Sequence, residues 1–292
     1  MTRDSRSSPD SSTNHITRFA PSPTGRLHLG HAYSAVLNHD VARASGGQLV
    51  LRIEDIDRDR CKPEFVDGII EDLAWLGLSW DALEIQSDHA AAHAAALDRL
   101  RTMGLVYPCI CTRAEIAASA SAPHGDAGAV YPGTCRAHPP APDDPRPVAW
   151  RLDVAKAMGI TGPLVWHDRD VGDVRADPAL SGDVVLGRKG LDVAYHLAVV
   201  VDDAAAGVTD VIRGLDLFSA THAQRLLQAL LDLPTPRYRH HALIAGRDGK
   251  RLAKRTSGST LADLCDAGVD PAVLLTDLRA ERLPVGFRWT NA

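Results

Sequence analysis

The sequence of 292 residues has no long apolar run, and its first residues do not have the pattern of a secretion signal. A helix needs about 20 consecutive apolar residues to cross a bilayer, and no run approaches that length. The first residues, MTRDSRSSPDSSTN, contain no apolar stretch of the kind that a signal peptide requires. We therefore expect a cytoplasmic protein with no membrane partner, in which residues 1–14 form a disordered polar tail.

A basic excess is also absent, because the formal net charge is −5 at pH 7. This balance argues against a protein that coats nucleic acid without specificity, although a local basic face would suffice for a specific RNA contact. The five cysteines are an odd number, and a cytosolic chain rarely forms disulfides. Three of them, Cys109, Cys111 and Cys135, cluster in the sequence and are candidate metal ligands.

The N-terminal third has the pattern of a strand–helix–strand unit. HITRFA predicts a strand, a Pro/Gly loop follows, residues 31–45 predict a helix that the glycines at 46–47 end, and QLVLRIEDID predicts a second strand. Such a unit implies a parallel sheet, in which ligands bind beyond the carboxyl ends of the strands. The Pro/Gly loop and the acids of EDID should therefore face one crevice.

The remainder of the chain alternates between helical and extended patterns, interrupted by a segment of different composition. Small residues, prolines, glycines and cysteines are frequent over 107–146, which predicts an insertion with its own small fold. Amphipathic helices are predicted over 62–80, 87–104 and 219–233, strands over 147–153, 163–170 and 237–246, and either element over 192–203 and 210–214. A basic loop over 246–259 and two short helices follow.

Two stretches could bind phosphate groups. In RFAPSPTGRLHLGH, the N-terminus of a helix attracts anions, Gly30 allows close approach, and His28 and His31 can each donate a hydrogen bond. The two histidines could instead be ordinary surface residues or a metal pair, although one ligand outside the helix and one inside it is poor metal geometry. The loop over 246–259 could close over a triphosphate, or be a solvated basic turn.

Together these stretches resemble the class I aminoacyl-tRNA synthetases. His28-Leu29-Gly30-His31 resembles the HIGH signature of that class, and RLAKR lies where the class has KMSKS. With RIEDID and VIRGLDL added, the chain resembles the glutamyl-tRNA synthetases, most closely their shortened branch, the glutamyl-queuosine tRNA(Asp) synthetases, because it ends soon after Arg255. Within the KMSKS-like stretch, Arg251 and Ala253 depart from the usual first lysine and central serine.

The resemblance implies an α/β fold with a Rossmann-like class I catalytic domain in two halves, 15–106 and 147–260. A zinc-binding insertion over 107–146 and a short helical tail over 261–292, with no anticodon-binding domain, would complete the chain. The implied activity is ATP-dependent activation of L-glutamate to glutamyl-adenylate, followed by transfer to the queuosine base of tRNA(Asp). The alternatives are a truncated glutamyl-tRNA synthetase that charges the 3′ end of tRNA(Glu), a nucleotidyltransferase for a small metabolite, and a catalytically inactive RNA- or amino-acid-binding module. We expect a monomer.

The resemblance also assigns roles to individual residues. ATP, accompanied by Mg²⁺, would be bound by His28, Gly30, His31 and Lys254, and the two histidines and the lysine would be catalytic. Glutamate would be bound by Arg18, Phe19, Ala20, Pro21, Ser22, Glu54, Tyr195 and Arg213. Two arginines and one glutamate match the charges of a dicarboxylic amino acid.

A structural zinc ion would be held by Cys109, Cys111, Tyr131 and Cys135. Zinc takes four ligands, and three clustered cysteines are one short. His124 and His138 are chemically more ordinary candidates for the fourth position, whereas Tyr131 has the spacing of the family. A site closed by four protein ligands stabilises a small fold and cannot activate water.

Overall fold

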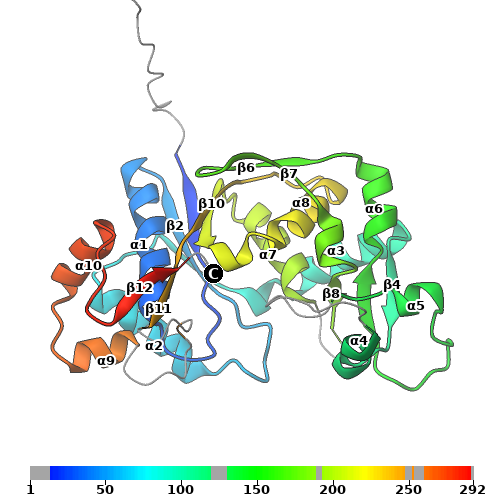
Figure 1. Cartoon of the computed structure of the whole chain (residues 1–292), viewed down its shortest axis with the longest axis horizontal. Helices are drawn as coiled ribbons and strands as arrows, with labels where there is room; N and C mark the ends of the chain where they lie inside the picture. Colours follow the sequence, from blue (N-terminus) through cyan, green and yellow to red (C-terminus); the bar gives the residue numbers. More distant parts are fainter. Residues whose placement is uncertain (1–13, 120–129, 189–192, 247–251, 253–259, 291–292) are drawn as a thin grey trace, which may run out of the picture.

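The structure is a computed structural model that describes residues 14–119, 130–188, 193–246, 252 and 260–290 (Figure 1). The predicted N-terminal tail, apart from Asn14, lies outside these residues. The same holds for Lys254 and for nearly all of the predicted basic loop. In the part of the chain that is described, every helix is too short or too polar to cross a membrane.

The predicted strand–helix–strand unit is present at the start of the fold. It consists of β1 (Ile16–Phe19), α1 (Leu29–Ala44) and β2 (Gln48–Ile53), and β1 and β2 pair in parallel. The helix begins two residues earlier than the sequence predicted, because His28 already caps it. Gly46 has a φ of 65°, a conformation that glycine adopts without strain, and it turns the chain from α1 into β2.

A seven-stranded sheet in the order β3-β2-β1-β9-β10-β6-β7 forms the centre of the molecule. Its other strands are β3 (Ala82–Ile85), β6 (Val165–Asp168), β7 (Gly172–Arg175), β9 (Asp210–Gly214) and β10 (Arg237–His241). All neighbours pair in parallel except β6 and β7. The chain continues from β1 to β2 on one side, whereas β9 joins β1 on the other. Such a reversal opens a crevice at the carboxyl ends of the two strands.

Helices pack around this sheet in two apolar clusters. One cluster is built on α1 and α2 (Pro63–Trp75), and the other on helices that follow β3. These helices are α3 (Ala90–Thr102), α6 (Val154–Thr161), α7 (Tyr195–Ala205) and α8 (Ala220–Leu230). Short 3₁₀ turns are η1 (Gln86–His89), η2 (Pro178–Ser181) and η3 (Leu215–Leu217). The stretch 192–203, left open between strand and helix, contains most of α7, whereas 210–214 is strand β9.

A separate three-stranded sheet lies at one end of the molecule (Figure 1). It pairs β4 (Val106–Cys109) with β5 (Ala149–Leu152), and β5 with β8 (Val185–Gly187), all antiparallel. Two short helices, α4 (Arg113–Ser119) and α5 (Thr134–Ala137), lie beside it. A capping box starts α4, because the backbone N–H of Thr112 donates to the Glu115 carboxylate and the backbone N–H of Glu115 donates to the Thr112 hydroxyl.

The C-terminal part differs from the sequence prediction in one strand. The stretch 237–246 breaks at Ala242 into β10 and β11 (Leu243–Gly246), and β11 pairs with an unpredicted strand, β12 (Phe287–Thr290). The two predicted short helices are α9 (Leu261–Asp266) and α10 (Pro271–Arg279). Before α9, the backbone of Thr260 bridges to that of His28, so the chain that follows the basic loop returns to the N-terminus of α1.

Candidate functional site

The crevice at the carboxyl ends of β1, β2 and β9 holds a cavity of about 460 Å³, a volume typical of small-molecule sites. Every predicted glutamate or ATP residue that the structure describes lines it. These residues are Arg18, Phe19, Ala20, Pro21, Ser22, His28, Gly30, His31, Glu54, Tyr195 and Arg213. Lys254 lies outside the described residues, but Leu252, two positions before it, also lines the cavity.

His28 and His31 fold into a reciprocal cap at the start of α1. The Nδ1 of His28 accepts the backbone N–H of Gly30 at 3.1 Å, and the Nδ1 of His31 accepts the backbone N–H of His28 at 3.2 Å. The two rings stack with their centroids 3.7 Å apart. Because each Nδ1 accepts, the neutral ring carries its hydrogen on Nε2 and can donate from there. The pair is thus built as two oriented donors at the positive end of a helix.

Gly30 is needed by this cap for a steric reason. A Cβ at position 30 would lie 3.1 Å from Cε1 and 3.2 Å from Nδ1 of His28, which is tighter than ordinary packing. A larger residue would therefore displace the His28 ring from its stacked position on His31. The same lack of a side chain leaves the backbone of the first helical turn open toward the cavity.

Arg213, on β9, is fixed on one wall of the cavity by buried acceptors. Its Nε donates to Nε2 of His240 at 3.1 Å, its Nη1 to the hydroxyl of Tyr195 at 3.3 Å, and its Nη2 to Thr221 and Gln224. The Nδ1–H of His240 in turn donates a hydrogen bond to Asp168, at 2.8 Å. Burial and the charge of Arg213 lower the pKa of His240 to about 4, so this histidine is neutral and acts as an acceptor.

Glu54, directly after β2, brings a carboxyl group to the same cavity. Burial raises its pKa to about 7, and the opposing charges of Arg52 and Arg18 limit the increase. The group therefore changes its charge close to neutral pH. Such a carboxyl is suited to bind a cationic ligand group, which would lower its pKa again.

Several residues around the cavity were not found from the sequence. Ser34 and His241 line it, and Arg52 and Asp203 lie behind Arg18, with Arg52 fully buried. The available signal was the acidic pair that ends the apolar run LAVVVDD. Charged residues at the end of a buried segment usually have a buried partner, but the sequence does not say which one.

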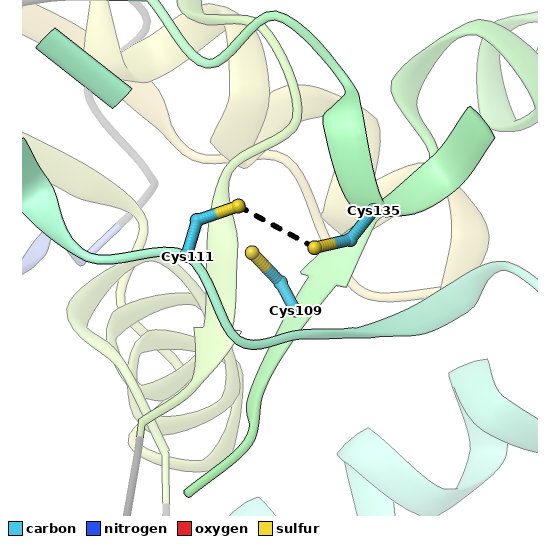
Figure 2. A group of neighbouring side chains, drawn as sticks. All are labelled: Cys109, Cys111 and Cys135. Atoms are coloured by element: carbon cyan, nitrogen blue, oxygen red, sulfur yellow. Dashed lines mark hydrogen bonds between the residues drawn. The ribbon is translucent and has the colours of Figure 1, made fainter. Parts of the chain in front are cut away.

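The three clustered cysteines meet beside the small sheet (Figure 2). The sulfur atoms of Cys109, Cys111 and Cys135 all lie within 4.8 Å of one another, and those of Cys111 and Cys135 are 3.4 Å apart. Burial and the hydrogen bond with Cys135 raise the pKa of Cys111 to about 11. A dication would favour the thiolates over the thiols, so the donor set fits a structural zinc ion.

The Tyr131 hydroxyl lies next to the three sulfurs. Its oxygen is 3.5 Å from the sulfur of Cys109 and 3.7 Å from that of Cys111, and it accepts the backbone N–H of Cys135 at 2.7 Å. His138 is exposed and is not among the described groups whose ligand atoms converge on the sulfurs, and His124 lies outside the described residues. The geometry thus offers the Tyr131 oxygen as a fourth metal ligand beside the three sulfurs.

A second group of possible metal ligands consists of His89, His93 and Asp202. One oxygen of Asp202 accepts from both imidazoles, at 2.9 and 2.7 Å, and the other accepts from Gln86 at 2.7 Å. Three donors thus satisfy this buried carboxylate without an ion.

Comparison with known proteins identifies the class of this fold and site. The family model described as "tRNA synthetases class I (E and Q), catalytic domain" matches residues 15–282. The crystal structure of a glutamate-tRNA synthetase from Elizabethkingia anophelis superposes with a TM-score of 0.70 at 26% identity, covering 83% of this chain and 53% of that one. The chain therefore belongs to the class I aminoacyl-tRNA synthetases, a class of ligases, and spans about half the length of that solved structure.

Curated relatives narrow the family further. A protein of Rhodobacter capsulatus named Glutamyl-Q tRNA(Asp) synthetase is 49% identical over 88% of this chain and 97% of its own length. A protein of Symbiobacterium thermophilum with the same name is 42% identical, over 89% of this chain and 84% of that one. Within class I, the chain thus belongs to the family of the glutamyl-Q tRNA(Asp) synthetases.

Proposed function

We propose that this protein activates L-glutamate with ATP and transfers it to the queuosine base in the anticodon loop of tRNA(Asp). The observation that carries the proposal is that the histidine cap, two arginines and a buried glutamate all line one cavity. Its cationic and anionic groups match a dicarboxylic amino acid, and the oriented donors beside them match a phosphate chain. The names of the relatives support the acceptor.

In this proposal Arg18 and Arg213 bind the carboxylates of glutamate, and Glu54 binds its ammonium group. A carboxylate oxygen of the bound glutamate attacks the α-phosphorus of ATP, the bond to the bridging oxygen breaks, and pyrophosphate leaves. The Nε2–H groups of His28 and His31 donate to the phosphate oxygens as negative charge accumulates there. Mg²⁺ bound with the nucleotide would neutralise further charge on the phosphates.

In the second step a hydroxyl of the cyclopentenediol ring of queuosine attacks the carbonyl carbon of glutamyl-adenylate, and AMP leaves. The three cysteines and Tyr131 would hold zinc in a purely structural site, remote from the reacting atoms. The same glutamate and ATP sites would serve a synthetase that charges the 3′ end of tRNA(Glu), so the acceptor distinguishes these alternatives.

The activation step is tested by exchange of labelled pyrophosphate into ATP. The assay is run with and without tRNA that carries queuosine. We expect exchange that depends on L-glutamate. Aspartate or glutamine at the same concentration should not support it. Exchange without any amino acid dependence would contradict the proposed activation and favour a different nucleotidyl transfer. The absence of exchange under both conditions would favour a binding module.

Lys254→Ala should slow this exchange, because the transition state should lose about 2–4 kcal/mol of stabilisation, the scale of one lost preorganised donor. We expect this because Lys254 holds the position of the phosphate-binding lysine in the KMSKS-like stretch. Lys156→Ala is the matched control, since Lys156 donates to the carbonyl of Gly104, in the turn before β4. If Lys254→Ala exchanges pyrophosphate as fast as the control and the wild-type protein, Lys254 has no role in the mechanism.

A further inference from the structure

Asp203, on α7, contacts one of the cavity arginines from behind. Both of its oxygens accept from Nε of Arg18, at 3.2 and 3.3 Å. Arg18 lines the cavity, whereas Asp203 is not among the described residues that do. Among the described residues, Nε is the only side-chain atom of Arg18 that takes part in a hydrogen bond. The contact therefore orients the guanidinium plane and leaves its two terminal amino groups for a ligand.

Arg52, on β2, holds Asp203 in turn. Its two terminal nitrogens donate to Oδ1 of Asp203 at 2.8 and 2.5 Å, and its Nε donates to Glu84 at 3.3 Å. The side chain of Arg52 has no exposed surface, and those of Arg18 and Asp203 are 5% and 9% exposed. Three buried charges thus follow one another from Arg52 through Asp203 to Arg18, with little solvent to loosen their contacts, whereas the Glu84 side chain at the far side of Arg52 is 21% exposed.

The charge of Asp203 also acts on Glu54, which lines the same cavity as Arg18. The groups that act on Glu54 are Arg18 on β1, Arg52 on β2, and Asp202 and Asp203 on α7, where Tyr195 also lies near it. The arginines lower the pKa of Glu54 and the two aspartates raise it. Asp202 differs from Asp203 in its contacts, because its oxygens are occupied by Gln86, His89 and His93.

We propose that Asp203 is a positioning residue for glutamate recognition, which fixes the orientation of Arg18 and sets the charge balance of the glutamate pocket without touching the substrate. This inference rests on the proposed function, because it assigns Arg18 to glutamate. An arginine that turns freely loses the geometric match of its planar fork to a carboxylate. Asp203 removes that freedom before the ligand arrives.

The test is kcat/KM for glutamate in pyrophosphate exchange, measured against pH for wild type and Asp203→Asn. We expect kcat/KM to fall about ten- to a hundredfold, by analogy with the range seen when a partner that orients a metal-ligating side chain is removed. Removing the negative charge of Asp203 lowers the pKa of Glu54. The acidic limb of the pH profile, which reports free-enzyme groups, should therefore move to lower pH. A fall in stability alone would leave this limb in place.

The matched control is Glu84→Gln, which removes another carboxylate from Arg52 without touching Arg18. We expect its kcat/KM and its acidic limb to match those of wild type. A double-mutant cycle with Arg18→Lys adds a second criterion. If Asp203 acts through Arg18, Asp203→Asn should cost little in the Arg18→Lys background. An undiminished cost there would overturn the proposal.

If Asp203→Asn does not fold, as judged by circular dichroism, Asp203→Glu serves in its place. This variant keeps the charge and displaces the carboxylate, so kcat/KM should fall while the acidic limb stays at its wild-type pH. A folded variant at position 203 with wild-type kcat/KM would refute the positioning role. A wild-type protein without glutamate-dependent exchange would instead refute the proposed function, so the two failures are distinguishable.

Discussion

Arg18→Ala should lower kcat/KM for glutamate in pyrophosphate exchange by about 3–5 kcal/mol, roughly 150- to 5,000-fold. The expected loss is large because Arg18 lines the cavity yet is almost completely buried. Water would therefore compensate poorly for the positive charge that the substitution removes. The substitution also leaves Asp203 without one of its two arginine partners. The measurement is a glutamate titration of exchange at saturating ATP.

Arg43→Ala is the control for this prediction. Arg43 lies on α1 and pairs with Asp81, and both side chains are partly exposed, so its removal should change the assay little. A selective effect at position 18, with the KM for ATP retained, would support a role in amino acid binding. An Arg18→Ala protein that folds and keeps its kcat/KM for glutamate would contradict the assignment.

Cys135→Ser should abolish zinc binding. We expect the purified wild-type protein to contain one zinc ion per chain and the variant to contain none, by elemental analysis. Structural zinc sites contribute about 10–16 kcal/mol of binding free energy in small domains, and this cluster is the main buried packing between α5 and the end of β4. Loss of the ion should therefore also lower the temperature at which this region unfolds.

Cys265→Ser is the matched control, because Cys265 is exposed and belongs to α9, which lies at the opposite end of the molecule from α4 and α5 (Figure 1). It should retain the metal content of wild type. Unchanged zinc in Cys135→Ser would refute the ligand set of three cysteines and Tyr131. Equal loss in both variants would point to a general effect of cysteine replacement instead.

Much of the site could be predicted from the sequence because it is built on local segments. The loop after β1, the cap of α1 and the acid after β2 lie within one βαβ unit, and parallel strands bring their carboxyl ends to one edge. Tyr195 and Arg213 are far away in the sequence, and the family resemblance, rather than any local pattern, joined them to this edge.

The features that the sequence did not predict depend on long-range pairing. The break at Ala242 exists because β11 pairs with β12, about 40 residues later, and no local signal marks such a partner. Likewise, Asp203 differs little in the sequence from Asp202, yet one faces two arginines and the other two histidines. Which partner a buried charge finds is decided by tertiary packing, and therefore by the structure.

The most direct test of the proposed function uses labelled glutamate, ATP, Mg²⁺ and two pools of tRNA. One pool comes from cells that make queuosine and the other from cells that cannot, and the two are otherwise the same. We expect label to enter only the first pool, and within it only tRNA(Asp). Label on tRNA(Glu) of both pools would contradict the account, because it would mean that the protein charges the 3′ end of tRNA(Glu).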